Sequence, residues 1–181
     1  DSVFSKISDT CTPQGVLCVL KQFHYNIEEM LRDKAPLFLL LENIQDPGNL
    51  GTMLRTGEGA GVSGIIMSRD TVDLYNPKVI RSTMGSIYRV PFYYAEDFAA
   101  AVHQVQQAGV SVYAAHLRGK NSYACQDYTK GTAFLIGNEG NGLREETAEL
   151  ADCYIRIPME GKVESLNAAV ASSILMYEAH R

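Results

Sequence analysis

Three polar segments that contain glycine carry most of the side chains able to do chemistry in this 181-residue sequence. They cover residues 43–56, 137–146 and 157–167. Glycine lets a backbone come close to a bound molecule, and the first N–H groups of a helix have no partner within it. Ser165 and Asn167 are both good caps for the apolar helix that follows them. The third segment therefore predicts a ligand site at a helix start or, equally, a capped core helix.

Glu139 lies in the second segment, within the run Gly-Asn-Glu-Gly-Asn-Gly of residues 137–142. The run lacks the Lys-Ser/Thr pair of a phosphate-binding loop, and its carboxylate would repel phosphate. It predicts either a tight turn before a helix near Leu143 or a loop whose backbone reaches a ligand. In the second case Glu139 would face a cation or a hydroxyl group.

Asn49 and Arg55 lie six residues apart around the start of a helix in the first segment. The apolar stripe of that helix runs through Leu50, Met53 and Leu54, so Arg55 falls outside it and can point toward a site. An ordinary salt bridge at the edge of a sheet would explain Arg55 as well.

Other catalytic patterns in the sequence are weak. Residues 59–64 match the Gly-x-Gly-x-x-Gly pattern of dinucleotide-binding folds, but they follow a helix and precede a strand, which is the wrong order. A helix C-cap and a turn explain these glycines better. The four histidines are scattered and form no Ser/His/Asp or Cys/His set.

Strand and helix signals alternate from Pro36 onward. We expect strands at residues 37–43, 64–67, 89–92, 110–115, 132–137 and 152–157, the third of them at an edge because it contains a proline. We expect helices around residues 50–57, 77–84, 95–108 and 143–150 and from residue 168 onward. This alternation predicts an α/β domain with a largely parallel sheet. Ligands bind at the carboxyl ends of such strands, where the three polar segments should converge.

Length and composition are those of one globular domain with a substantial core: 46% of the residues are hydrophobic and 20% are charged. The net charge of −5 provides no basic field to attract nucleic acid, and no apolar run is long enough to cross a membrane. Four cysteines without CxxC spacing indicate reduced thiols in a cytoplasmic protein and no zinc site. Residues 1–34, with a short strand at residues 16–20 and a helical piece at 27–32, are expected to be a linker or the tail of another domain.

Taken together, the three segments resemble the TrmH-like (SpoU) branch of the SPOUT methyltransferases, which transfer a methyl group from S-adenosylmethionine to a ribose 2′-oxygen of tRNA or rRNA. The similar stretches are DPGNLGTMLRTGEGAGV (residues 46–62), FLIGNEGNGL (134–143) and IPMEGKVESLNAAVA (157–171). Between the first two, Arg81 and Gly85 match the helix-to-strand segment of the family. Order and spacing agree over residues 37–181.

This resemblance implies a parallel sheet flanked by helices, a C-terminal trefoil knot that forms the cofactor pocket, and a homodimer with the site near the subunit interface. The family's catalytic positions fall on Asn49, Arg55, Glu139, Ser165 and Asn167. Its cofactor-contacting positions fall on Ala115, His116, Gly137, Asn138, Gly140, Ile157, Met159 and Leu166. The expected substrate is RNA, with rRNA favoured over tRNA. Residues 35–181 would be the catalytic domain, and residues 1–34 the end of an upstream RNA-binding domain.

Two alternatives stay open from the sequence. The chain could be a catalytically silent RNA-binding subunit with the same fold, although the presence of Asn49, Arg55 and Asn167 argues against this. It could also be a nucleotide-dependent oxidoreductase, against which the misplaced glycine pattern argues.

Overall fold

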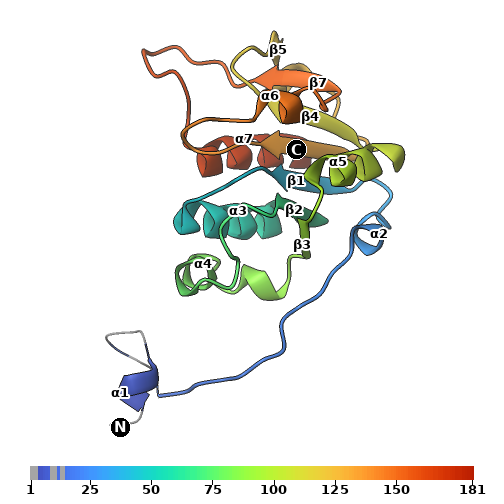
Figure 1. Cartoon of the computed structure of the whole chain (residues 1–181). Helices are drawn as coiled ribbons and strands as arrows, with labels where there is room; N and C mark the ends of the chain where they lie inside the picture. Colours follow the sequence, from blue (N-terminus) through green and yellow to red (C-terminus); the bar gives the residue numbers. More distant parts are fainter. Residues whose placement is uncertain (1–3, 9–11, 13–14) are drawn as a thin grey trace.

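The apolar runs at residues 37–41, 64–68 and 132–136 pair side by side near the middle of a seven-stranded sheet (Figure 1). The computed structural model describes residues 4–8, 12 and 15–181. The strands are β1 (Leu37–Leu41), β2 (Gly64–Ser68), β3 (Phe92–Ala95), β4 (Ser111–Ala115), β5 (Asn121–Ser122), β6 (Thr132–Ile136) and β7 (Cys153–Arg156). Their order across the sheet is β3-β2-β1-β6-β4-β7-β5, and every pairing between them is parallel. The predicted parallel α/β fold is confirmed.

Helices cover both faces of the sheet. Neighbouring residues of a strand point to opposite sides, and the apolar side chains on each side pack against helices. The helices are α1 (Phe4–Ile7), α2 (Ile27–Met30), α3 (Pro47–Ala60), α4 (Pro77–Ser82), α5 (Phe98–Gln107), α6 (Glu145–Ala148) and α7 (Ala168–His180), with short 3-10 helices η1 (Ser86–Tyr88) and η2 (Tyr123–Cys125). Leu39 and Leu41 belong to the core cluster that contains apolar residues of α3, α4 and α7. Phe38 and Leu40 belong to the cluster that contains those of α2, α5 and α6. The central strands are buried on both sides, as their continuous apolar sequences predict.

The strand predicted at residues 16–20 is wrong. This segment has no regular secondary structure, and Val19 is 90% exposed. It lies away from the sheet at the bottom of Figure 1. No strand among the described residues pairs with it, so its β propensity has no partner there. Phe23 is attached to the domain, since its N–H donates to the Tyr75 hydroxyl at 2.8 Å.

Several predicted boundaries also shift. The helix expected from Ala95 begins at Phe98, because Ala95 completes β3 and the Asp97 carboxylate caps the helix through the N–H of Ala100 at 2.9 Å. The strand expected at residues 89–92 begins at Phe92, at the predicted edge of the sheet. The helix expected at residues 143–150 is only α6, and the short edge strand β5 was not predicted. Gly61 caps α3 in a left-handed conformation (φ 77°), as expected from its place after a helix.

The C-terminal segment returns across the sheet. After β7 the chain passes through the long loop of residues 157–167, orange at the upper left of Figure 1, and α7 then packs against α3, β1 and β6. The knot expected from the family resemblance stays a prediction. No helix in the described part of the chain is long and apolar enough to cross a membrane.

Gly51 allows α3 to pack closely against α4. A Cβ atom at this position would lie 1.8 Å from the Ser82 hydroxyl oxygen and 2.6 Å from the Ser82 Cβ. We expect Gly51→Ala to lower the free energy of unfolding by about 1–3 kcal/mol, because α4 has to move away. Chemical denaturation would measure the change. Gly59→Ala is the matched control in the same helix: its Cβ would meet only the Tyr177 hydroxyl, at 3.0 Å. Equal stability of the two variants would contradict this packing argument.

Candidate active site

The three polar segments follow β1, β6 and β7 at the carboxyl ends of these strands. The second and third segments, with the end of β4, line a cavity of about 280 Å³, whereas the first segment, Asn49 included, and Asn167 lie outside its wall. This volume lies near the lower end of the range for small-molecule sites. The wall is formed by Ala115, His116, Leu117, Ile136, Gly137, Asn138, Glu139, Gly140, Asn141, Gly142, Leu143, Ile155, Arg156, Ile157, Met159, Glu164, Ser165, Leu166, Ala168 and Ala171. All eight predicted cofactor-contacting residues are among them, as are Glu139 and Ser165.

A continuous chain of hydrogen bonds joins the three segments next to this cavity. The amide nitrogen of Asn49 donates to Glu139 Oε1 at 3.0 Å. The amide nitrogen of Asn167 donates to Asn49 Oδ1, also at 3.0 Å. Asn49 therefore connects the second segment to the third, although it lies 90 positions from Glu139 and 118 from Asn167 in the sequence.

Glu139 has further partners in the first segment. Its carboxylate accepts the backbone N–H of Gln45 at 3.1 Å and that of Asp46 at 3.0 Å. Partial burial would raise the pKa of the Glu139 carboxyl, but the hydrogen bonds from Asn49, Asp46 and Gln45 outweigh burial and hold the pKa below its ordinary value. Glu139 is therefore ionised at neutral pH and organises the loops as an acceptor.

Asn167 is the N-cap of α7, as its sequence position predicted. Its Oδ1 accepts the N–H groups of Ala169 at 2.9 Å and Val170 at 3.2 Å. The same side chain donates to Asn49, so capping fixes the orientation of the amide. Ser165, the other candidate cap, does not cap the helix; it is exposed and lies in the cavity wall.

The loop of residues 137–142 is both a tight turn and part of the cavity wall. Asn138 and Gly142 exchange two backbone hydrogen bonds, of 3.0 and 2.9 Å. A Cβ atom at Gly137 would lie 2.2 Å from the backbone of Gly142 and of Leu143, so only glycine fits there. The segment is therefore a tight turn, and it also lines a cavity that could hold a ligand, so the two predicted roles are compatible.

His116 lies in the cavity wall, directly after β4. Burial and then the nearby Arg118 lower the pKa of its imidazole, so the ring is neutral at neutral pH. Its Nδ1 accepts the backbone N–H of Arg118 at 3.1 Å, and the ring contacts that of Tyr154 at a centroid distance of 5.1 Å.

Arg55 does not line the cavity. It lies about 9 Å beyond Asn49 along the axis of α3 and about 120° around that axis. Its side chain is exposed and has no hydrogen bond or ion pair with any described residue. The salt bridge considered as the ordinary explanation is therefore absent from the described part of the chain. Because α3 and α7 pack together, Arg55 on α3 and Asn167 at the start of α7 lie on neighbouring elements.

Several residues of the wall were not predicted. Ile136 ends β6, Ile155 is the last buried residue of β7, and Leu143 follows the glycine loop, so they supply apolar surface beside the polar groups. Their place at the ends of strands was the available signal. Arg156 and Glu164 also line the cavity, and nothing in their spacing distinguished them.

Comparison with known proteins gives consistent matches. The SpoU rRNA Methylase family matches residues 36–177. The 23S rRNA (guanosine(2553)-2'-O)-methyltransferase RlmP of Bacillus subtilis (strain 168) is 35% identical over 177 residues, which are 98% of this chain and 69% of that protein.

Two solved structures with bound AdoMet have the same fold. The SpoU methyltransferase AviRb from Streptomyces viridochromogenes superposes with a TM-score of 0.79 at 30% identity, over 86% of this chain and 60% of its own. An rRNA methyltransferase from Sinorhizobium meliloti gives a TM-score of 0.74 at 40% identity, over 81% and 56% of the two chains. The chain thus spans less than two thirds of both solved structures. It belongs to the SpoU rRNA methylase family.

Proposed function

We propose that this chain is the catalytic domain of an S-adenosylmethionine-dependent methyltransferase that modifies a ribose 2′-hydroxyl of RNA, with rRNA favoured over tRNA. The observation that carries the proposal is the chain of hydrogen bonds from Glu139 through Asn49 to Asn167, which joins all three family segments beside one cavity. The rRNA activity named for the Bacillus subtilis relative supports the choice of substrate.

The cavity has the features that S-adenosylmethionine requires. Buried apolar side chains of Ile136, Leu143 and Ile155 offer a surface for the adenine ring. The lack of room for a Cβ at Gly137 shows how closely the backbone approaches its neighbours there. The wall contains the carboxylates of Glu139 and Glu164 and the guanidinium of Arg156, which suits a ligand that carries both positive and negative charge. When bound, the sulfonium supplies an already activated methyl group.

The remaining task of the protein is to align a ribose hydroxyl and to manage the loss of its proton. Alignment alone can contribute several kcal/mol. Asn49, Asn167 and Ser165 would orient the ribose. We propose that the exposed Arg55 anchors an RNA phosphate and stabilises negative charge that develops on the 2′-oxygen, since a guanidinium stays protonated in proteins.

We also propose that the chain acts as a homodimer and that RNA recognition uses a further domain attached through residues 1–34. The separation of Arg55 from the cavity of its own subunit supports a site completed at a subunit contact.

Calorimetry with S-adenosylmethionine tests the proposal first. We expect one site per chain and no response to NAD, because the glycine pattern at residues 59–64 is a helix cap. Methyl transfer should then be measured on rRNA and on tRNA, each with the full-length protein. Cofactor binding without transfer to either RNA would favour the silent RNA-binding subunit. Absence of cofactor binding would overturn the proposed function, and sedimentation showing a cofactor-binding monomer would overturn the dimer.

Arg55→Ala should reduce turnover on cognate RNA by about 100-fold or more, with the affinity for S-adenosylmethionine changed little, because the guanidinium acts on the RNA and not on the cofactor. Single-turnover methylation and calorimetry would measure the two effects. Arg32→Ala is the matched control. Arg32 is an exposed arginine that precedes β1, at the amino ends of the strands and away from the cavity. Near-normal turnover of the Arg55 variant would refute this role.

Glu139→Gln should lower activity without shifting the pH dependence of turnover between pH 6 and 9, because Glu139 does not titrate in that range. The folded-state pKa of Glu139 is depressed, so its stabilisation is present above the unfolded pKa of about 4 and is lost as the pH falls through the folded value. The wild type should therefore lose its stability advantage over Glu139→Gln below about pH 4. A wild-type pH profile with a step near neutrality that disappears in Glu139→Gln would make Glu139 the base.

A further inference from the structure

Glu42 is a buried carboxylate that lies outside the cavity wall. It directly follows β1, and its side chain is 1% exposed. Burial of a charge is costly unless the charge is fully hydrogen-bonded, so such a group is kept only where its partners are held in place.

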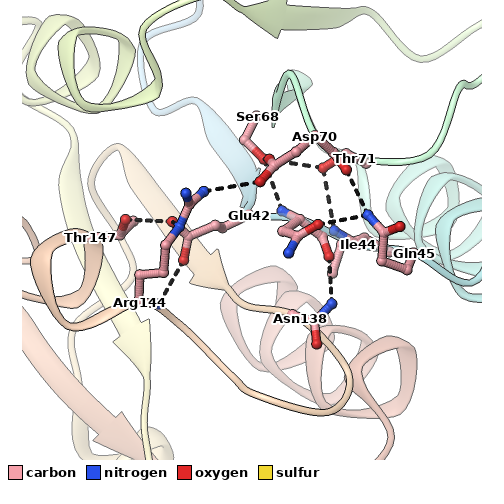
Figure 2. A network of polar contacts seen from close by, with 10 residues as sticks. Glu42, Ile44, Gln45, Ser68, Asp70, Thr71, Asn138, Arg144 and Thr147 are labelled. Atoms are coloured by element: carbon pink, nitrogen blue, oxygen red, sulfur yellow. Dashed lines mark hydrogen bonds and ion pairs between the residues drawn. The ribbon is translucent and has the colours of Figure 1, made fainter.

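The carboxylate of Glu42 has three donors, all from the segment that follows the glycine loop. The backbone N–H of Arg144 donates to Oε2 at 2.8 Å, and Arg144 Nε donates to Oε1 at 2.7 Å. The hydroxyl of Thr147 also donates to Oε1. Figure 2 shows the Arg144 side chain and Thr147 beside this carboxylate. The hydrogen bond with Glu42 raises the pKa of the Arg144 guanidinium, which stays charged.

Glu42 also holds the beginning of the same loop. Its backbone N–H donates to the carbonyl oxygen of Ile136 at 2.9 Å, at the point where the chain leaves β6. The loop of residues 137–143 therefore starts and ends on one residue. Glu42 fixes the start through its backbone and the end through its side chain.

The middle of the loop is attached to the residues that follow Glu42. The side-chain amide of Asn138 donates to the carbonyl oxygen of Asn43 at 2.8 Å (Figure 2). Glu139 is bound by Gln45, Asp46 and Asn49. Without the carboxylate of Glu42 the Glu139 end would stay attached. The Arg144 end would keep only the contact of its guanidinium with Asp70, at 3.2 Å, and the backbone hydrogen bonds between Gly142 and Asn138.

We propose that Glu42 is a positioning residue for the cofactor site: through Arg144 and Thr147 it sets the shape of the loop of residues 137–143, and with it the affinity for S-adenosylmethionine. This role rests on the proposed function, since it assigns the cavity to that cofactor. Glu42 holds the loop from the end of β1, which lies between β2 and β6 within the sheet.

The test is Glu42→Gln, which keeps the shape of the side chain but places an amide NH₂ among donors. We expect its dissociation constant for S-adenosylmethionine, measured by calorimetry where every variant is fully folded, to rise about tenfold. Turnover at saturating cofactor should change by no more than about twofold, because the hydrogen bonds of Glu139 remain. A merely structural role would lower the folded fraction and leave the dissociation constant of the folded protein unchanged.

Arg144→Gln and Thr147→Val extend the test if Glu42→Gln does not fold. Each removes one donor and keeps the backbone N–H of Arg144, so each should raise the dissociation constant by about threefold. The matched control is Glu96→Gln. Glu96 is an exposed carboxylate paired with Arg69 and has no bond to the loop, so its dissociation constant should equal that of the wild type.

The outcomes separate the two proposals. If the wild type binds S-adenosylmethionine and the folded variants of Glu42, Arg144 and Thr147 bind it equally well, the positioning role is overturned and the proposed function stands. If the wild type does not bind it, both are overturned. A tenfold weaker dissociation constant in Glu42→Gln, with Glu96→Gln unchanged, supports the positioning role.

Discussion

The hydrogen bonds that the Glu139 carboxylate accepts from the first segment are the interaction on which the site depends. Three N–H donors, two from the backbone and one from Asn49, converge on this single charged group. Hydrogen bonds to an ionised acceptor are stronger than neutral ones, and here they join chain segments that are otherwise unrelated in sequence. Asn49 then passes the same connection to Asn167 at the start of α7. The cavity next to these residues is consequently enclosed by loops that restrain one another.

The parallel sheet makes this convergence possible. All strands point the same way, so every loop after a strand begins at the same edge. Two of the strands concerned, β1 and β6, are short and almost fully buried, whereas β7 is buried only at Ile155. The buried strands give the loops rigid attachment points. The core thus contributes to function indirectly, because it fixes where the polar segments begin.

Arginine side chains around the site differ in whether they are already paired with a carboxylate. Arg144 is neutralised by Glu42 and Asp70, and Arg118 by Glu145. Arg55 has no such partner among the described residues and remains exposed on α3. A guanidinium already paired with a carboxylate has little capacity left for another anion, whereas Arg55 keeps all of its donors. This difference supports Arg55, and not Arg144, as the group that meets RNA.

The sequence by itself determined the class of fold, the central strands, and the three segments that form the site. Those features follow from local information: apolar runs predict buried strands, and Asn before an apolar segment predicts a capped helix start, as found at Asn167. Family resemblance supplied the eight residues predicted to contact the cofactor, all of which lie in the cavity wall. The exact ends of β3 and α6, and the absence of a strand at residues 16–20, escaped this reasoning because they depend on which neighbours are available for pairing.

Only the tertiary structure decided how the segments are held together. Contacts such as Glu42 with Arg144, or Asn49 with Asn167, join positions more than a hundred residues apart, and no periodicity or spacing encodes them. Glu42 fell within the strand predicted at residues 37–43 and Arg144 within the helix predicted at residues 143–150, and neither was singled out. Their burial and pairing arise because folding brings β1 beside β6, which places the end of one strand next to the loop that leaves the other.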